Sequence, residues 1–220
     1  MQRERELPES MKTILCFGDS NTWGYVPGSA RRHAYAKRWT GCLQAALGSA
    51  YQVVEEGLNG RTTVWDEPFR EGRNGSRLLM PLLESHAPVD LLILFLGTND
   101  LKHFYSATAF DSARGLRSLI AIARSSLSGP QGGAPGMLVI APPRMVQLST
   151  LMLEQFQGAR EKSLHFAAAF ADAARLENCC FLDSSQVIES SPVDGIHFDE
   201  AAHRNLGLAI AERVREIIPE

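Results

Sequence analysis

Long hydrophobic runs are missing from this 220-residue sequence. The clearest apolar run, residues 91–96 (LLILFL), has the length of a β-strand, whereas a membrane-spanning helix needs roughly 18 apolar residues. The N-terminal sequence MQRERELPESMK is charged and lacks the apolar core of a secretory signal. We therefore predict a cytoplasmic protein that has no membrane partner.

Cysteine is scarce and is not arranged for cross-linking or for binding metal. The four cysteines are Cys16, Cys42, Cys179 and Cys180, and no C-x-x-C spacing occurs among them. Neither a disulfide framework nor a zinc site is indicated. We expect reduced thiols, no metal and no cofactor.

Positive charge is not concentrated in any segment. The formal net charge is −3, and the chain has no basic block of the kind that binds nucleic acid. Glycine-rich phosphate loops of the P-loop or G-x-G-x-x-G type do not appear where a nucleotide-binding fold needs them. These absences exclude nucleic acid as an expected partner and leave a small molecule.

Short apolar segments alternate with longer amphipathic ones along the chain. We predict strands over residues 13–17, 52–55, 91–96, 137–141 and 180–182, and helices over 39–48, 76–85, 109–127, 157–176 and 200–217. Strands that alternate with helices imply βαβ units and a parallel sheet. The expected fold class is α/β, a three-layer α/β/α sandwich with a flavodoxin-like five-stranded parallel sheet in the order 2-1-3-4-5.

The length suits a single domain. We assign residues 12–220 to that domain and predict a flexible N-terminal extension over residues 1–11. Asp199 is the expected N-cap of the last helix. The segment 142–156 is long and apolar, and it fits a lid, part of an acyl pocket or an oligomer contact.

Four polar clusters follow predicted strands: GDSN at 18–21, GLNGR at 57–61, GTND at 97–100 and DGIH at 194–197. In an open parallel sheet, ligands bind beyond the carboxyl ends of the strands. The topology therefore predicts that all four clusters meet at one edge of the sheet.

The residue types in these clusters favour nucleophilic catalysis. A serine hydroxyl needs a base to take its proton, and His197 is the candidate base for Ser20. Asp194 precedes His197 by three residues, a spacing that lets its carboxylate reach the imidazole Nδ1 and fix the tautomer. The N–H groups of Ser20 and Gly60 and the side-chain amide of Asn99 are candidate donors to an oxyanion.

The same clusters resemble the four blocks of the SGNH (GDSL-type) hydrolase superfamily. FGDSN at 17–21 resembles the nucleophile block, NGRTT at 59–63 the glycine block, GTND at 97–100 the asparagine block and DGIHF at 194–198 the acid–base block. The resemblance implies the SGNH hydrolase fold, with Ser20, Asp194 and His197 as the triad.

Longer segments, among them ILCFGDSNTWGYVPG, EEGLNGRTT and DGIHFDEA, resemble the arylesterase/acyltransferase-like branch. That resemblance implies a metal-independent serine esterase that acts on short-chain aryl or alkyl esters, passes acyl groups to alcohols and forms a homo-oligomer. The chain departs from the pattern at residue 21, which is asparagine here, whereas the family motif has the leucine that gives it its name. Asn21 is not a catalytic position, so the expected mechanism is unaffected.

Three other functions remain open at this stage. A carbohydrate O-acetyl esterase would use the same fold and triad. A metallophosphoesterase also uses G-D and G-N-x-D-like clusters, but the chain lacks a D-x-H pair after its first strand and a late H-x-H. A binding module without catalysis would leave the triad unexplained.

Aromatic side chains flank the motifs, and Trp23, Trp65, Phe104 and Phe198 are candidate pocket residues, although core packing explains such residues equally well. We expect His203 to lie on a solvated helix face.

Charged residues beside the motifs have other interpretations. Asp19 and Asp100 are expected to brace loops. Arg61 is left open between contact with substrate and pairing with Glu55 or Glu56.

Overall fold

The computed structural model describes residues 11–219 and contains one five-stranded sheet. Its strands are β1 (Lys12–Gly18), β2 (Tyr51–Gly57), β3 (Leu91–Phe95), β4 (Gly136–Ala141) and β5 (Cys180–Asp183). Every neighbouring pair is parallel, and the order is β2-β1-β3-β4-β5. The predicted fold class and strand order are therefore confirmed. The predicted flexible extension lies, apart from Met11, outside the described residues.

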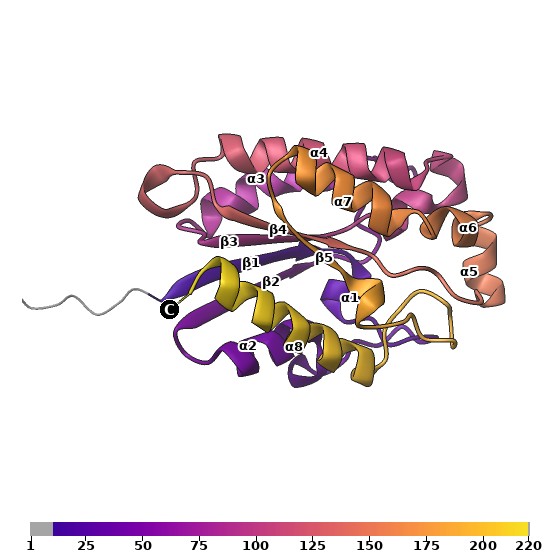
Figure 1. The fold of residues 1–220 in the computed structure, drawn as a ribbon. Coiled ribbons are helices and arrows are strands. Elements are labelled where there is room, and N and C mark those ends of the chain that lie inside the picture. Colours follow the sequence, from indigo (N-terminus) through magenta and orange to yellow (C-terminus); the bar gives the residue numbers. More distant parts are fainter. Residues whose placement is uncertain (1–10, 220) are drawn as a thin grey trace, which may run out of the picture.

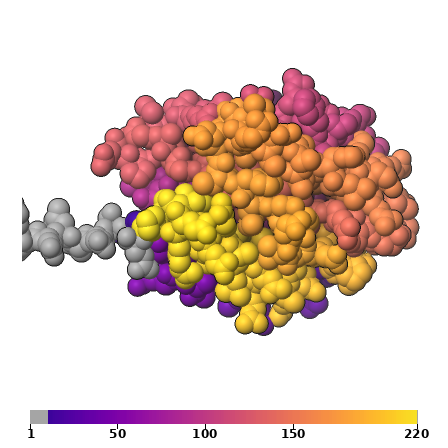
Figure 2. Space-filling model, in the orientation of Figure 1, coloured from indigo at the N-terminus to yellow at the C-terminus, as the bar shows by residue number. Residues whose placement is uncertain are grey.

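Helices cover both faces of the sheet (Figure 1). On one face lie α2 (Trp39–Leu47) and α8 (Glu200–Ile217), and on the other lie α3 (Gly75–Ser85), α4 (Ala109–Ser125) and α7 (Phe166–Leu176). In the space-filling view, α7 in orange and α8 in yellow occupy much of the visible face (Figure 2). No helix within residues 11–219 has the length and apolar character needed to cross a membrane.

Short helices gather at the end of the sheet where the strands finish (Figure 1). They are α1 (Ser20–Trp23), α5 (Thr150–Gln155) and α6 (Ala159–Ser163). Single 3-10 turns span η1 (Tyr35–Lys37), η2 (Thr98–Leu101), η3 (His103–Tyr105), η4 (Pro130–Gly132) and η5 (Ser184–Gln186). The carboxyl edge of the sheet is therefore built from connecting segments, as expected for a ligand site in this architecture.

The strands divide the apolar residues between two cores because successive side chains point to opposite faces. Leu15, Phe17, Leu92, Leu94 and Val139 belong to the core under α3, α4 and α7. Ile14, Cys16, Leu91, Ile93 and Leu138 belong to the core under α2 and α8. This burial on both faces explains why the strands read as continuous apolar runs.

Two elements differ from the sequence-based prediction. The single helix expected over 157–176 is interrupted, because Ser163 donates to the carbonyl of Arg160 and accepts from the N–H of Met145. Side-chain bonds of this kind compete with continued helix. The segment 142–156, expected as a loop, contains α5. The expected N-cap is confirmed, since the Asp199 carboxylate accepts from the N–H of Ala202.

Candidate active site

Ser20 stands at the first position of α1, directly after β1. The carboxylate of Asp19 caps this short helix by accepting from the N–H of Asn21 at 2.9 Å. Gly57, at the end of β2, allows α1 to approach the sheet, because a Cβ there would lie 2.1 Å from the backbone nitrogen of Trp23. The close packing of α1 on the strand ends sets the position of the serine.

Ser20, His197 and Asp194 form one hydrogen-bonded chain. The Ser20 Oγ lies 3.0 Å from His197 Nε2, and His197 Nδ1 lies 2.8 Å from Asp194 Oδ2. A carboxylate only accepts, so Nδ1–H donates to Asp194 and Nε2 is left to accept from the serine hydroxyl. The tautomer is therefore the one that a general base for Ser20 requires.

Backbone donors hold the Asp194 carboxylate in place. Its Oδ1 accepts from the N–H groups of Ile196 and His197, and its Oδ2 also accepts from Gly28 N–H at 3.0 Å. Burial raises the pKa of Asp194, but the hydrogen bonds from the His197 ring and from the backbone outweigh that effect and lower the pKa to about 2. Asp194 is consequently a fixed negative charge beside the imidazole at all ordinary pH values.

The three residues predicted to donate to an oxyanion, Ser20, Gly60 and Asn99, lie at one cavity. Neither the N–H of Ser20 nor that of Gly60 donates to another residue within 11–219. Gly60 adopts a positive φ of +84°, which glycine accepts without strain. The amide nitrogen of Asn99 donates to the carbonyl of Arg61 at 3.1 Å and to the Asp19 carboxylate at 3.4 Å, and these bonds orient the side chain. All three residues line the same cavity.

Buried charged residues brace the loop that carries Gly60. The Asp100 carboxylate accepts from the N–H and the hydroxyl of Thr63. Arg61 donates to the carbonyl oxygens of Gly18 and Glu56 and is 3% exposed. Arg61 therefore binds backbone carbonyls, that of Glu56 among them, and is not one of the residues that line the cavity.

Burial also changes the acidity of these groups. It raises the pKa of Asp100 to about 6, an effect that the hydrogen bonds from Thr63 only partly offset. Burial likewise raises the pKa of Asp19 to about 6, and the bond from Asn21 N–H acts in the opposite direction. Both carboxylates serve as loop braces, as the sequence indicated.

The cavity at Ser20 has a volume of about 210 Å³. Besides Ser20, Gly60, Asn99 and His197, it is lined by Tyr25, Asn59, Arg70, Lys102, Leu151, Met152, Gln155, Phe156 and Ile196. The apolar wall comes mainly from α5 and the residue after it. Of the three roles open for segment 142–156, the position of α5 favours part of a substrate pocket.

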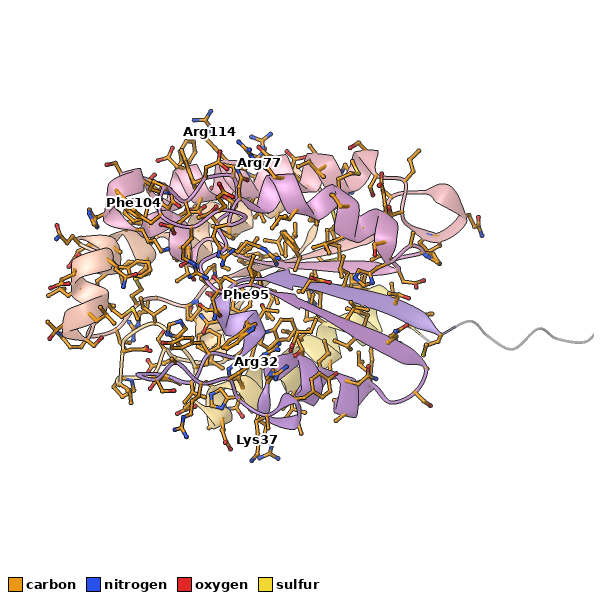
Figure 3. The ribbon with its side chains drawn as sticks, turned by 180° about the vertical axis from the view of Figure 1, so that it is seen from behind. Arg32, Lys37, Arg77, Phe95, Phe104 and Arg114 are labelled. Atoms are coloured by element: carbon orange, nitrogen blue, oxygen red, sulfur yellow. The ribbon has the colours of Figure 1, made fainter. Side chains whose placement is uncertain are left out.

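None of the four aromatic residues predicted to line the pocket lines this cavity. Phe198 is fully buried and stacks on Phe95, which Figure 3 places in the interior of the molecule. Trp23 packs under the guanidinium of Arg32 at 4.9 Å. These two side chains contribute to packing next to the site.

Trp65 and Phe104 are also displaced from the cavity. Both rings pack against Tyr105, with centroid distances of 6.0 and 4.5 Å respectively. Figure 3 shows Phe104 near the helical layer that contains α4, away from the interior position of Phe95. The prediction was wrong here because nearness in sequence to a motif does not fix the direction of a ring.

Tyr25 is the aromatic residue that does reach the site. Gly24 has a φ of +87° and ends α1, and the turn brings Tyr25 rather than Trp23 to His197. The Tyr25 ring lies 4.3 Å from the imidazole at an interplanar angle of 29°. The glycine between two aromatic residues was the available sequence signal.

His203 is buried, contrary to the expected solvated face. Its Nδ1 accepts from the N–H of Trp39 at 3.2 Å, and burial lowers its pKa to about 3. Gly207 in α8 permits this arrangement, because a Cβ there would lie 2.6 Å from the carbonyl oxygen of Trp39. His203 is therefore a neutral acceptor at the α2–α8 contact.

Within residues 11–219, no three His, Cys, Asp or Glu side chains are grouped so as to hold a metal ion. A two-metal phosphoesterase centre needs several such ligands around two ions. The described part of the chain thus offers no ligand set for the metallophosphoesterase alternative.

Comparison with known proteins agrees with the geometry. The family model described as "GDSL-like Lipase/Acylhydrolase family" matches residues 16–204. The solved M. smegmatis aryl esterase is 40% identical, with a TM-score of 0.90 over 94% of this chain and 100% of that chain. Est24, a carbohydrate acetylesterase from Sinorhizobium meliloti, is 36% identical, with the same TM-score and coverage. A comparison with curated proteins finds no match. This chain belongs to the GDSL-like lipase/acylhydrolase family and is a carboxylic ester hydrolase.

Proposed function

We propose that this chain is a metal-independent serine esterase that hydrolyses short-chain carboxylic esters through an acyl-enzyme. The observation that carries the proposal is the hydrogen-bonded chain from Ser20 through His197 to Asp194, which opens on a cavity that Gly60 and Asn99 also line. An activated serine and preorganised donors are the two requirements of acyl transfer.

The geometry supports a two-step mechanism. Ser20 Oγ attacks the ester carbonyl carbon while His197 Nε2 takes the hydroxyl proton. The carbonyl oxygen gains the negative charge and accepts from Ser20 N–H, Gly60 N–H and the Asn99 amide. The intermediate collapses as His197 gives its proton to the leaving alcohol. Water then attacks the acyl-enzyme, His197 takes one proton from it, and the carboxylic acid and free Ser20 are released.

The size and composition of the cavity support a short acyl group. A volume of about 210 Å³ is below the ~300 Å³ at which drug-sized ligand pockets begin. Leu151, Met152, Phe156 and Ile196 give the cavity apolar walls. Acetyl-type esters of simple aryl or alkyl alcohols fit this space best, and the aryl esterase neighbour supports the same substrate class.

An acetylated carbohydrate is the second candidate substrate. The side chains of Asn59 and Gln155 at the cavity supply hydrogen-bonding groups that a sugar uses. The 36% identical carbohydrate acetylesterase supports this candidate as well. Acyl transfer to alcohols and assembly into a homo-oligomer stay predictions.

The direct test is a kinetic comparison of p-nitrophenyl esters from acetyl to octanoyl, with acetylated xylose as a competing substrate. We expect kcat/KM to be highest for the shortest acyl chains and Ser20→Ala to lose turnover of every ester. Ser118→Ala on the exposed side of α4 is the matched control and should behave as wild type. Equal activity of wild type and Ser20→Ala would contradict the proposal.

A further inference from the structure

Two cationic side chains line the cavity at Ser20, and no aspartate or glutamate among residues 11–219 lines it. The cations are Arg70 and Lys102. An ester made of uncharged acyl and alcohol parts gives such charges nothing to bind. The excess of positive charge in the cavity therefore favours a substrate that carries a negative charge.

Lys102 is already neutralised by a partner. Its ammonium pairs with the carboxylate of Glu67, and the two side chains are 10% and 4% exposed. A buried and closely paired charge contributes little net potential to the neighbouring cavity. Lys102 is thus part of the cavity wall.

Arg70 has no such partner. Within residues 11–219, its side chain makes no ion pair and no hydrogen bond with another residue. Its guanidinium nevertheless lies against Gly60, because a Cβ built on Gly60 would be 3.5 Å from Arg70 Nη1. A free guanidinium at this place offers paired donors that match a carboxylate.

The position of Arg70 relative to the reacting atoms brings it close to the ester carbonyl. The leaving oxygen must receive its proton from His197 Nε2, so the alcohol occupies the side of His197 and Tyr25. The carbonyl oxygen points to Gly60, and Arg70 lies against Gly60. The guanidinium therefore lies beside the carbonyl group of the bound ester, from where it can reach a carboxylate on the acyl chain.

We propose that Arg70 is a specificity-determining residue that binds a carboxylate at the far end of the acyl chain. At equal length of the acyl chain, the favoured substrates are then monoesters of short dicarboxylic acids, such as monoalkyl succinates. This inference rests on the proposed serine esterase function, with the acyl chain attached to Ser20 as a hemisuccinyl ester. The reaction consumes water and releases the alcohol and the dicarboxylate.

The test compares monoethyl succinate with ethyl succinamate, in which a carboxamide replaces the carboxylate at nearly the same size. Ethanol release gives kcat/KM for each ester, and their ratio is the readout, so a general change in activity cancels. We expect wild type to favour the carboxylate at least fivefold at low salt. Arg70→Gln should bring the ratio close to one, and Arg70→Glu should reverse it.

Arg114→Gln is the charge-matched control, because Arg114 projects from the outer surface of α4 (Figure 3). It should keep the wild-type ratio. A second pair, 4-acetoxybenzoate and 4-acetoxybenzamide, places the charge on the leaving group. An Arg70 effect confined to this second pair would overturn the assignment to the acyl side.

The outcomes separate the two proposals. If wild type cleaves both succinyl esters at the same ratio as Arg70→Gln, the inference about Arg70 is wrong while the esterase function stands. If wild type cleaves neither ester and also leaves p-nitrophenyl acetate intact, the esterase function fails and the inference falls with it.

Discussion

The phenol ring of Tyr25 lies on the imidazole of His197, with centroids 4.3 Å apart and planes inclined by 29°. Asp194 holds the imidazole at a different place, because it binds Nδ1 at the edge of the ring. The ring is therefore held in its plane by one residue and along one edge by another. Positioning of this kind holds Nε2 at hydrogen-bonding distance from the serine hydroxyl before the reaction begins.

Replacing Tyr25 tests the value of that stacking. Tyr25→Phe keeps the ring, and we expect its kcat to stay within about twofold of wild type. Tyr25→Ala removes the contact and should lower kcat/KM about fivefold, in line with an aromatic pair worth about 1 kcal/mol. Steady-state kinetics with p-nitrophenyl acetate measures both variants. Equal activity of the alanine variant and wild type would mean that the stacking plays no part.

Asp194→Asn should preserve the fold while lowering kcat by about 1,000- to 10,000-fold, because an amide favours the wrong tautomer of His197. The pKa of Asp194 is about 2, so its own ionisation does not shape the pH–rate profile of the wild-type enzyme between pH 4 and 9. Kinetics and circular dichroism on the same preparation check the prediction. A variant with more than a tenth of wild-type kcat would remove Asp194 from the triad.

Asn99→Ala should reduce kcat about 100- to 1,000-fold and leave KM nearly unchanged, because the amide is needed mainly when the oxyanion has formed. The matched control is Asn205→Ala on the exposed part of α8, which should retain wild-type kinetics. A rise in KM at constant kcat would instead assign Asn99 to ground-state binding.

Asp100 gives a prediction about stability and pH. Burial raises its pKa from 3.8 to about 6, so the folded state binds this proton more tightly than the unfolded state. Its contribution to stability is fully present below pH 3.8 and is lost as the pH rises through 6. Asp100→Asn cannot ionise and lacks this dependence.

Between pH 7 and pH 4, the free energy of unfolding of wild type should therefore gain about 2 kcal/mol relative to that of Asp100→Asn. The full contribution, from about two pKa units at roughly 1.4 kcal/mol each, is reached only below pH 3.8. Urea titrations at pH 4, 5.5 and 7 measure the difference. Parallel curves for the two proteins would show that Asp100 is ionised in the fold at every pH tested.

The sheet and the meeting of the motifs at one of its edges were predictable from the sequence for a physical reason. An apolar run such as LLILFL at 91–96 is typical of a strand buried on both faces, and parallel topology brings the motifs after each strand to one edge. Ser20, Asn99 and His197 could be placed together without knowing any distance, because their positions follow from strand order alone.

The walls of the cavity were not predictable in this way. Tyr25 enters through the positive φ of Gly24, and Arg70 reaches Gly60 from a long polar loop. Such directions depend on turn geometry and on contacts between segments far apart in sequence. The burial of His203 likewise depends on α2 packing closely against Gly207, a tertiary contact that the pattern of α8 does not reveal.

The central claim is that Ser20 is an activated nucleophile, and intact-mass analysis after exposure to a small fluorophosphonate tests it most directly. Wild type and Ser20→Ala are treated side by side in the presence of EDTA. We predict a single adduct on wild type, mapped by peptide analysis to Ser20, and none on the variant. Folded wild type that gains no adduct, or a variant that gains the same one, would contradict the account.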